Sequence, residues 1–220
     1  MEQSTKNQPR KQYAYDFIKK RILSCEYAPG LHLNEQQLCE AMGGISRTPV
    51  RDAVSRLEQE GLLDILPKKG ILVSELRFGD INRIFEVRML LEPYVLRRYG
   101  NNLDTDQLRY FAQIMSDHTK IPFDSFYDLD DQFHNFVMSA MHNQYLIDAY
   151  QNISNLNQRL RMLSGTLVEN RLADTFTEHR AIIRACQQQN WELAAEAMTQ
   201  HLEASRISTF QMIAENEDGF

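Results

Sequence analysis

Hydrophobic residues recur at helical spacing over most of the chain, and the pattern changes character near its first third. The spacing predicts a helix over residues 13–24 and two further helices that begin after Asn34 and Ser46. Short apolar runs on both sides of a basic turn at 67–70 then predict a pair of strands. Two helices joined by a glycine-containing turn form a helix-turn-helix, and here a hairpin follows it directly.

The remainder of the chain shows helical periodicity alone. Asp80 is a good N-cap residue after a short linker, and no strand-like alternation follows it. The predicted helices are 81–99, 104–118, 123–141, 144–164, 168–189 and 191–213. We therefore expect a mainly α-helical protein, with a winged helix-turn-helix domain over residues 1–76 and an antiparallel bundle of about six helices over 77–220.

Composition and charge narrow the classes of function. No apolar run reaches the roughly 18 residues of a membrane-spanning helix, and the first residues lack the apolar core of a secretory signal. The three cysteines are scattered, which predicts reduced thiols in a cytoplasmic protein without a membrane partner. Residues 1–77 carry 12 Lys and Arg against 10 Asp and Glu, whereas residues 78–220 carry 12 against 20. This contrast suits a small nucleic-acid-binding domain attached to an acidic domain with another task.

The third predicted helix has an apolar arc and a neighbouring polar arc. The polar arc lies near the helix N-terminus and contains Arg47, Thr48, Arg51 and Ser55. Arginine binds guanine edges or phosphates, and hydroxyl groups and N-terminal amides bind phosphates. When the helix is taken alone, a solvated polar face is the favoured explanation of this arc, because charged helix faces usually contact only water. The basic hairpin tip at Lys68 and Lys69, directly after the helix, favours DNA binding because such a hairpin is placed to touch the DNA backbone.

These motifs resemble the winged helix-turn-helix of GntR-type bacterial transcription regulators. The resemblance covers most of residues 13–76 and rests on Tyr27-x-Pro29-Gly30, Ser46-Arg47-Thr48-Pro49-Val50-Arg51-Asp52-Ala53, Leu57-Glu58-x-Glu60-Gly61-Leu62 and Pro67-x-x-Gly70-x-x-Val73. It implies DNA contacts from Ser46, Arg47, Thr48 and Arg51 on the helix and from Lys69 and Gly70 on the hairpin. Gln36 is a further candidate contact where the family often has arginine. The chain also departs from the family in its doubled glycine, Gly43-Gly44, where a single glycine is usual.

Three of the six histidines lie on apolar stripes of the predicted bundle. These are His134, His179 and His201, and Asp130 lies one turn before the first of them. A single buried histidine is more often a core residue than a ligand, but this group is costly to bury without a metal or paired hydrogen bonds. Three histidines and a carboxylate from three helices can hold a divalent metal ion such as zinc or nickel and leave coordination positions open.

The same residues carry a second resemblance, to the FCD ligand-sensing domain of the FadR branch of the GntR family. It spans residues 80–213 and rests on Arg88-x-x-Leu91-Glu92, Asp130-x-x-Phe133-His134, Glu178-His179-x-x-Ile182-x-x-Ala185 and His201-Leu202. A bundle of six rather than seven helices resembles the shorter, VanR-like subgroup of this domain. The resemblance implies a divalent metal bound by Asp130, His134, His179 and His201 that helps to hold a small organic acid.

Arg88 lies within the apolar stripe of the first bundle helix, so its buried guanidinium needs a partner. Glu92, one turn later, is a structural partner, and the carboxylate of a ligand is a functional one. Stripe position does not distinguish the two, because arginine is well shaped for either. Asn157 and Arg161 on the fourth bundle helix are further candidates for the ligand pocket.

Together these patterns predict a ligand-responsive transcription regulator and not an enzyme. We expect it to bind a palindromic double-stranded DNA operator as a homodimer and to sense a small carboxylate metabolite. One alternative is a metal-dependent enzyme that activates water at the Asp/His cluster, although no obvious acid or base residue accompanies the cluster. The other alternative is a regulator whose metal is purely structural.

Overall fold

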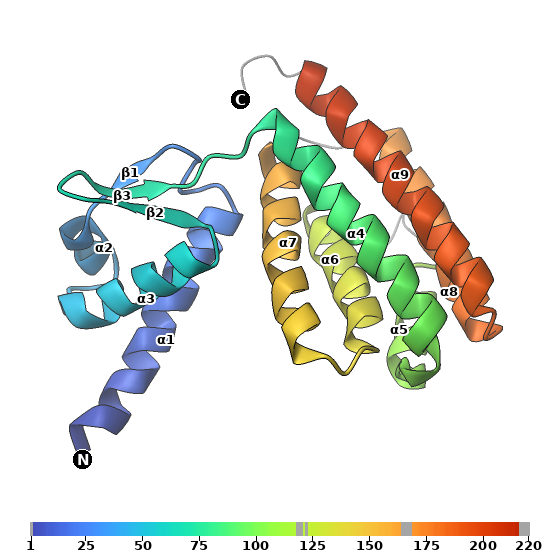
Figure 1. The fold of residues 1–220 in the computed structure, drawn as a ribbon, viewed down its shortest axis with the longest axis horizontal. Helices are drawn as coiled ribbons and strands as arrows, with labels where there is room; N and C mark the ends of the chain where they lie inside the picture. Colours follow the sequence, from blue (N-terminus) through green and yellow to red (C-terminus); the bar gives the residue numbers. More distant parts are fainter. Residues whose placement is uncertain (1, 118–120, 122, 164–168, 216–220) are drawn as a thin grey trace. The chain divides into compact units, whose positions relative to one another are not determined.

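The computed structural model of the protein describes residues 2–117, 121, 123–163 and 169–215 (Figure 1). The chain divides into two compact units, Met1–Leu76 and Arg77–Phe220, and each has its own hydrophobic core. Helices dominate both units, and a small sheet belongs to the first, so the expected mainly α-helical class is confirmed. Among the described residues, no helix combines the length and apolar character needed to cross a bilayer.

The first unit contains three helices, α1 (Glu2–Leu23), α2 (Glu35–Ala41) and α3 (Arg47–Gln59). Asn34 caps α2, because its side chain accepts a hydrogen bond of 2.8 Å from the backbone N–H of Gln37. The apolar face of α3 packs on α1 and is buried. Helix α1 begins at Glu2, earlier than the predicted residue 13. The sequence pattern missed this start because the first residues are polar and carry no hydrophobic stripe.

The sheet of this unit has three strands in the order β1-β3-β2. β2 (Leu63–Leu66) and β3 (Gly70–Val73) form the predicted antiparallel hairpin. β1 (His32–Leu33) pairs with the other edge of β3. The sequence pattern did not predict this strand, because two residues are too few for a periodic signal. The backbone of Lys68 has a φ of 65° in the turn, and Lys69 donates its backbone N–H to the carbonyl of Leu66. We call this turn, residues 67–70, the wing tip.

The second unit contains the six predicted helices within the described residues. They are α4 (Phe78–Tyr99), α5 (Thr105–Ile114), α6 (Phe123–Ser139), α7 (Gln144–Leu163), α8 (Glu169–Gln187) and α9 (Trp191–Glu215), with a short 3₁₀ helix η1 (Gly100–Asn102) after α4. Helix α4 begins before the expected cap Asp80, whose carboxylate instead accepts from the backbone N–H of Arg77 at 2.8 Å. The expected helix ends at His118, Ser164 and Val168 lie outside the described residues.

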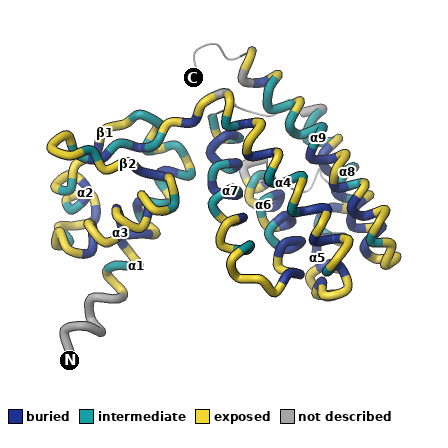
Figure 2. Tube along the Cα trace, viewed as in Figure 1, coloured by how far each residue is buried: buried dark blue, intermediate teal, exposed yellow. Residues whose placement is uncertain are grey.

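Helices α4 and α9 pack side by side and run antiparallel (Figure 1). At one end Arg206 donates to Asn82 at 3.0 Å, and at the other Arg97 pairs with Glu192 at 2.9 Å. Buried and exposed positions recur along α4 and along the first half of α9, whereas residues 203–211 of α9 are intermediate or exposed (Figure 2). Their neighbours α6, α7 and α8 add apolar side chains to the same core. The interior also contains charged and imidazole side chains, namely Arg88, Glu92, Asp130, His134, Arg159, His179 and His201.

Candidate metal centre and DNA-binding surface

The four residues predicted to bind a metal come together inside the bundle. Asp130 and His134 lie on α6, His179 on α8 and His201 on α9, and all four are buried. One ligand atom from each of them lies within 4.8 Å of the others. The i, i+4 spacing on α6 places its two residues on one face, and the packing of α8 and α9 supplies the other two.

The distances between these atoms fit a divalent transition metal ion. His201 Nε2 lies 3.2 Å from His134 Nε2 and 3.3 Å from His179 Nε2. Asp130 Oδ1 lies 3.4 Å from His179 Nε2 and 3.8 Å from His134 Nε2. Ligands at metal distances of about 2.0–2.1 Å are roughly 2.8–3.0 Å apart at octahedral angles and roughly 3.3–3.4 Å apart at tetrahedral angles. Three of the four distances fall within these limits, and the distance between Asp130 and His134 is longer. When bound, such an ion supplies positive charge and open coordination positions for the oxygen atoms of an anion.

Two carboxylates orient two of the imidazole rings. His134 Nδ1 lies 2.6 Å from Glu92 Oε2, and His201 Nδ1 lies 2.7 Å from Glu178 Oε2. Because a carboxylate oxygen accepts, each Nδ1 donates its proton and each Nε2 keeps a lone pair toward the metal position. Burial lowers the pKa of His179 and His201, which favours the neutral imidazole that binds metals. In the described part of the chain, the buried Nδ1 of His179 has no hydrogen-bond partner.

Two arginines hold the carboxylates around the centre. The terminal nitrogens of Arg161 donate to Asp130 and Asp131, and Arg171 makes two hydrogen bonds of 2.8 and 3.0 Å to Glu178. Burial raises the pKa of Asp130, but Arg161 and the histidines outweigh it and hold that pKa well below its usual range. Asp130 is therefore anionic. Sequence reasoning missed Arg171, although it lies seven residues before Glu178, a spacing of two helical turns.

Glu92 is the structural partner that was considered for Arg88. It is fully buried and accepts 2.8 Å hydrogen bonds from Arg88 Nε and from the hydroxyl group of Tyr150. Burial raises the pKa of Glu92, but Arg88 and His134 outweigh this effect and hold the pKa well below its usual range. Arg88 reaches Glu92 through Nε. Its two terminal nitrogens have no hydrogen-bond partner among the described residues and remain available to a ligand.

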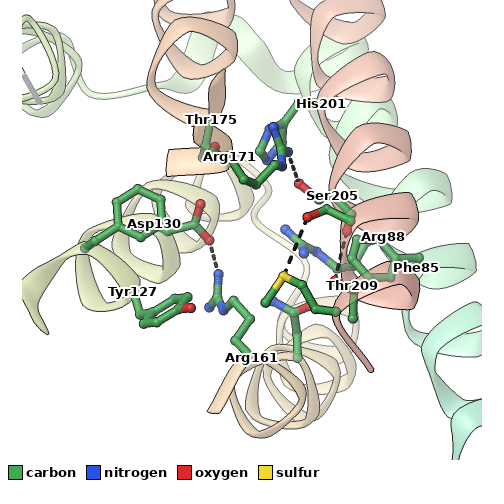
Figure 3. A pocket seen from close by; sticks show the side chains of 14 residues that line it. Phe85, Arg88, Tyr127, Asp130, Arg161, Arg171, Thr175, His201, Ser205 and Thr209 are labelled. Carbon is green, nitrogen blue, oxygen red and sulfur yellow. Dashed lines mark hydrogen bonds and ion pairs between the residues drawn. The ribbon is translucent and has the colours of Figure 1, made fainter. Parts of the chain in front are cut away.

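A cavity of about 40 Å³ lies beside the metal-ligating residues, enough for roughly three water molecules. Figure 3 shows Arg88, Arg161, Arg171, Asp130 and His201 around it. Its remaining lining consists of Phe85, Phe126, Tyr127, Asn157, Thr175, Ser205, Ser208, Thr209 and Met212. All three residues predicted to bind the ligand, Arg88, Asn157 and Arg161, are therefore in this lining. Within this lining the terminal nitrogens of Arg161 donate to Asp130 and Asp131.

The residues predicted to contact DNA lie on the surface of the first unit. Ser46, Arg47, Thr48 and Arg51 are exposed in the cap and first turns of α3, whereas Pro49 and Val50 are buried beneath them. This separation follows from helical periodicity, which turns the apolar positions toward α1. An exposed helix N-terminus with two arginines has the shape and charge to enter a major groove.

The remaining predicted contacts flank this helix. Lys69 is exposed at the wing tip, where Gly70 has a φ of 99° that a side chain rarely tolerates. Gln36 is exposed on α2 and donates to Glu40 at 2.9 Å. Arg51 Nε donates to Glu35 Oε1 at 2.7 Å, a pair between α3 and α2 that sequence spacing did not indicate. The Arg51 side chain keeps 64% of its surface exposed in this pair.

Comparison with known proteins identifies relatives of this chain in sequence. Residues 10–73 match the model for bacterial regulatory proteins of the gntR family, and residues 83–204 match the model for the FCD domain. The HTH-type transcriptional repressor RspR of Escherichia coli K12 is 28% identical over 217 residues, which cover 97% of this chain and 94% of RspR.

Solved structures agree with the fold. A GntR transcriptional regulator from Rhodococcus sp. RHA1 superimposes with a TM-score of 0.77 at 17% identity, covering 94% of this chain and 98% of its own. A structure described as a metal-free FCD domain has a TM-score of 0.58 at 20% identity and covers 64% of this chain and 99% of its own. At these identities the likeness concerns the fold alone. By the two family matches, the chain belongs to the gntR family of bacterial regulatory proteins and is a transcriptional regulator of the GntR and FCD type.

Proposed function

We propose that this regulator reads an operator with the exposed face of α3 and senses a small carboxylate at the metal-associated cavity of the second unit. The observation that carries the sensing role is Arg88. Its guanidinium is buried, it lines the cavity beside Asp130 and His201, and its terminal nitrogens have no partner among the described residues. A buried guanidinium with unpaired N–H groups is suited to a ligand carboxylate, which accepts two parallel hydrogen bonds.

The charge around the cavity also supports an anionic effector. Three arginines, Arg88, Arg161 and Arg171, face the four carboxylates of Glu92, Asp130, Asp131 and Glu178. With neutral imidazoles, a bound divalent cation turns this single negative excess into a single positive one. A monoanion then neutralises the site, which favours its burial there. Asn157 is buried in the same lining and supplies an amide to orient the ligand.

The response to the effector requires two states of the protein. A ligand shifts DNA affinity only when it binds one arrangement of the DNA-binding modules more tightly than another. A homodimer on a palindromic operator supplies such arrangements, because the spacing of two α3 helices must match two half-sites. We propose that the protein acts in this way in the cytoplasm, where its DNA target is found.

The DNA-binding part is tested on the operator selected by the full-length protein from genomic fragments. Arg51→Ala is expected to weaken specific binding by about 1–3 kcal/mol, roughly 5- to 150-fold. Arg109→Ala is the matched control, because Arg109 is an exposed arginine of α5 that pairs with Asp106. Unchanged operator affinity in Arg51→Ala overturns the assignment of α3 as the reading helix.

The sensing part is tested by thermal shift with a panel of small carboxylates, on metal-loaded and on chelated protein. A true effector raises the unfolding temperature of the loaded wild type, because binding to the native state stabilises it. Arg88→Met is expected to abolish this rise. An equal rise in the chelated protein shows that any metal is structural, and no rise with any carboxylate counts against an acid effector.

A further inference from the structure

Glu92 occupies the point where the cavity arginine and the metal centre meet. It lies on α4 with its carboxylate fully buried. One oxygen, Oε2, faces His134 Nδ1 at 2.6 Å. The other, Oε1, accepts from Arg88 and Tyr150, both at 2.8 Å. A single carboxylate thus joins a metal-ligating imidazole to the guanidinium proposed to hold the effector.

The chemistry of this carboxylate decides which nitrogen of His134 carries the proton. Ionised Glu92 has acceptors only, so the imidazole must donate from Nδ1 and present the Nε2 lone pair to the metal position. We propose that Glu92 is a positioning residue that fixes His134 in its metal-binding tautomer and couples the metal to Arg88. This inference rests on the proposed function for the metal and for the role of Arg88 toward the effector.

The coupling follows from the shared carboxylate. An effector that binds the terminal nitrogens of Arg88 moves or polarises the guanidinium whose Nε holds Glu92. Glu92 in turn holds His134, so effector binding changes the environment of a metal ligand without touching it. Linkage is reciprocal, and the metal must alter effector affinity by the same factor.

A second carboxylate provides an internal comparison. Glu178 holds His201 Nδ1 at 2.7 Å and is itself held by Arg171, which also lines the cavity. Arg171 differs from Arg88 because both its terminal nitrogens are already bonded, to Glu178 and Ser205. Of the two carboxylates, Glu92 is therefore the one joined to an arginine with nitrogens available to a ligand.

The substitution Glu92→Gln tests the tautomer while preserving shape. Glutamine has one oxygen and one NH₂ group, but the glutamate site meets donors on both sides. If the oxygen faces Arg88 and Tyr150, the NH₂ group donates to His134 Nδ1 and drives the proton to Nε2. Nε2 then carries the proton and has no lone pair with which to bind the metal. Removing an outer partner of this kind lowers metal affinity by about 10- to 100-fold.

The experiment uses full-length protein and Ni²⁺ alone as the probe. Imidazole nitrogen NMR on chelated protein is expected to show the Nδ1–H tautomer at His134 and His201 in the wild type. Glu92→Gln moves only His134 to Nε2–H and lowers Ni²⁺ affinity 10- to 100-fold. Glu178→Gln moves only His201, and Tyr150→Phe leaves the His134 tautomer unchanged because the carboxylate remains. An unchanged His134 tautomer with wild-type Ni²⁺ affinity in Glu92→Gln overturns the positioning role.

A double-mutant cycle tests the link to Arg88. If Arg88 acts on the metal through Glu92, Arg88→Met adds no further loss of Ni²⁺ affinity in the Glu92→Gln background. Additive losses overturn the coupling. The double variant also guards against misfolding, since it leaves no unpaired buried charge from this ion pair. If the wild type fails to bind Ni²⁺, the metal part of the proposed function is refuted. If the wild type binds Ni²⁺ and Glu92→Gln changes neither the Ni²⁺ affinity nor the His134 tautomer, only this inference is refuted.

Discussion

Replacing His179 by leucine should have opposite effects on the metal-free and metal-loaded protein. His179 is fully buried, and its Nδ1 has no hydrogen-bond partner among the described residues. Its Nε2 lies 3.3 Å from that of His201. Because Glu178 holds the His201 proton on Nδ1, His179 donates from Nε2 to the His201 Nε2 lone pair and leaves its own Nδ1 lone pair unsatisfied. A buried unsatisfied polar group costs about 1–3 kcal/mol. Leucine, of similar size, removes the unsatisfied Nδ1 and also the Nε2 hydrogen bond, whose net contribution is only about 0.5–1.5 kcal/mol.

The magnitude follows from these two terms. Metal-free His179→Leu is expected to gain about 0.5–1.5 kcal/mol in free energy of unfolding, after the loss of the Nε2 hydrogen bond. That gain corresponds to an unfolding temperature higher by roughly 1–6 °C in a chain of this size. In the wild type, Ni²⁺ at 100 times its Kd adds about 2.7 kcal/mol. The variant has lost a ligand, so its metal-induced rise should disappear.

The assay is thermal unfolding of chelated and Ni²⁺-loaded protein, with two control variants. His134→Leu also removes a ligand, but it takes a donor from Glu92 Oε2 and leaves a buried carboxylate oxygen unsatisfied. It should therefore destabilise the metal-free protein by about 1–3 kcal/mol. His142→Leu changes an exposed histidine and should alter neither state. A metal-free His179→Leu that is less stable than wild type refutes the reasoning about Nδ1, and a retained metal-induced rise refutes the ligand assignment.

Three further predictions concern other parts of the chain. Gly100→Ala places a Cβ atom 2.2 Å from the Trp191 ring, so it should lower the free energy of unfolding by about 1–3 kcal/mol in urea titrations. Lys68→Gly relieves a left-handed backbone (φ 65°) and should raise the free energy of unfolding by about 0.5–1 kcal/mol. Lys69→Ala should leave the free energy of unfolding unchanged and should reduce the slope of log DNA affinity against log salt concentration by about one. Burial lowers the pKa of His179 and His201 below the usual 6.5, so below that pH the unfolded chain binds protons that the folded chain does not. The metal-free protein should therefore lose stability as the pH falls below 6.5, which urea titrations at pH 5.5 and 7.5 measure.

Local patterns predicted the features that depend on a single helix or strand pair. The faces of α3 follow from helical geometry, so the buried Val50 and the exposed Arg51 were predictable from spacing. Asp130 and His134 share a face of α6 for the same reason. Features without a periodic signal were missed, as the strand β1 and the polar first turns of α1 show.

Pairings between distant segments could not be read from spacing. Glu92 and His134 lie on different helices, and their 2.6 Å contact depends on how α4 packs against α6. Arg161 lies in the cavity lining, but its spacing did not indicate that its terminal nitrogens donate to two aspartates of α6. Sequence spacing identifies which side chains leave a helix on its buried face but does not determine which groups they meet there.

The sequence by itself determined the mainly helical class, the family and the buried position of the ionisable residues, because each follows from periodicity or a local motif. The tertiary structure decided the partners of those residues. A charge or imidazole inside a bundle must be matched by groups from neighbouring helices, since the interior offers no water to replace them. Packing therefore selected Glu92 for His134 and Glu178 for His201, and it left the terminal nitrogens of Arg88 facing the cavity.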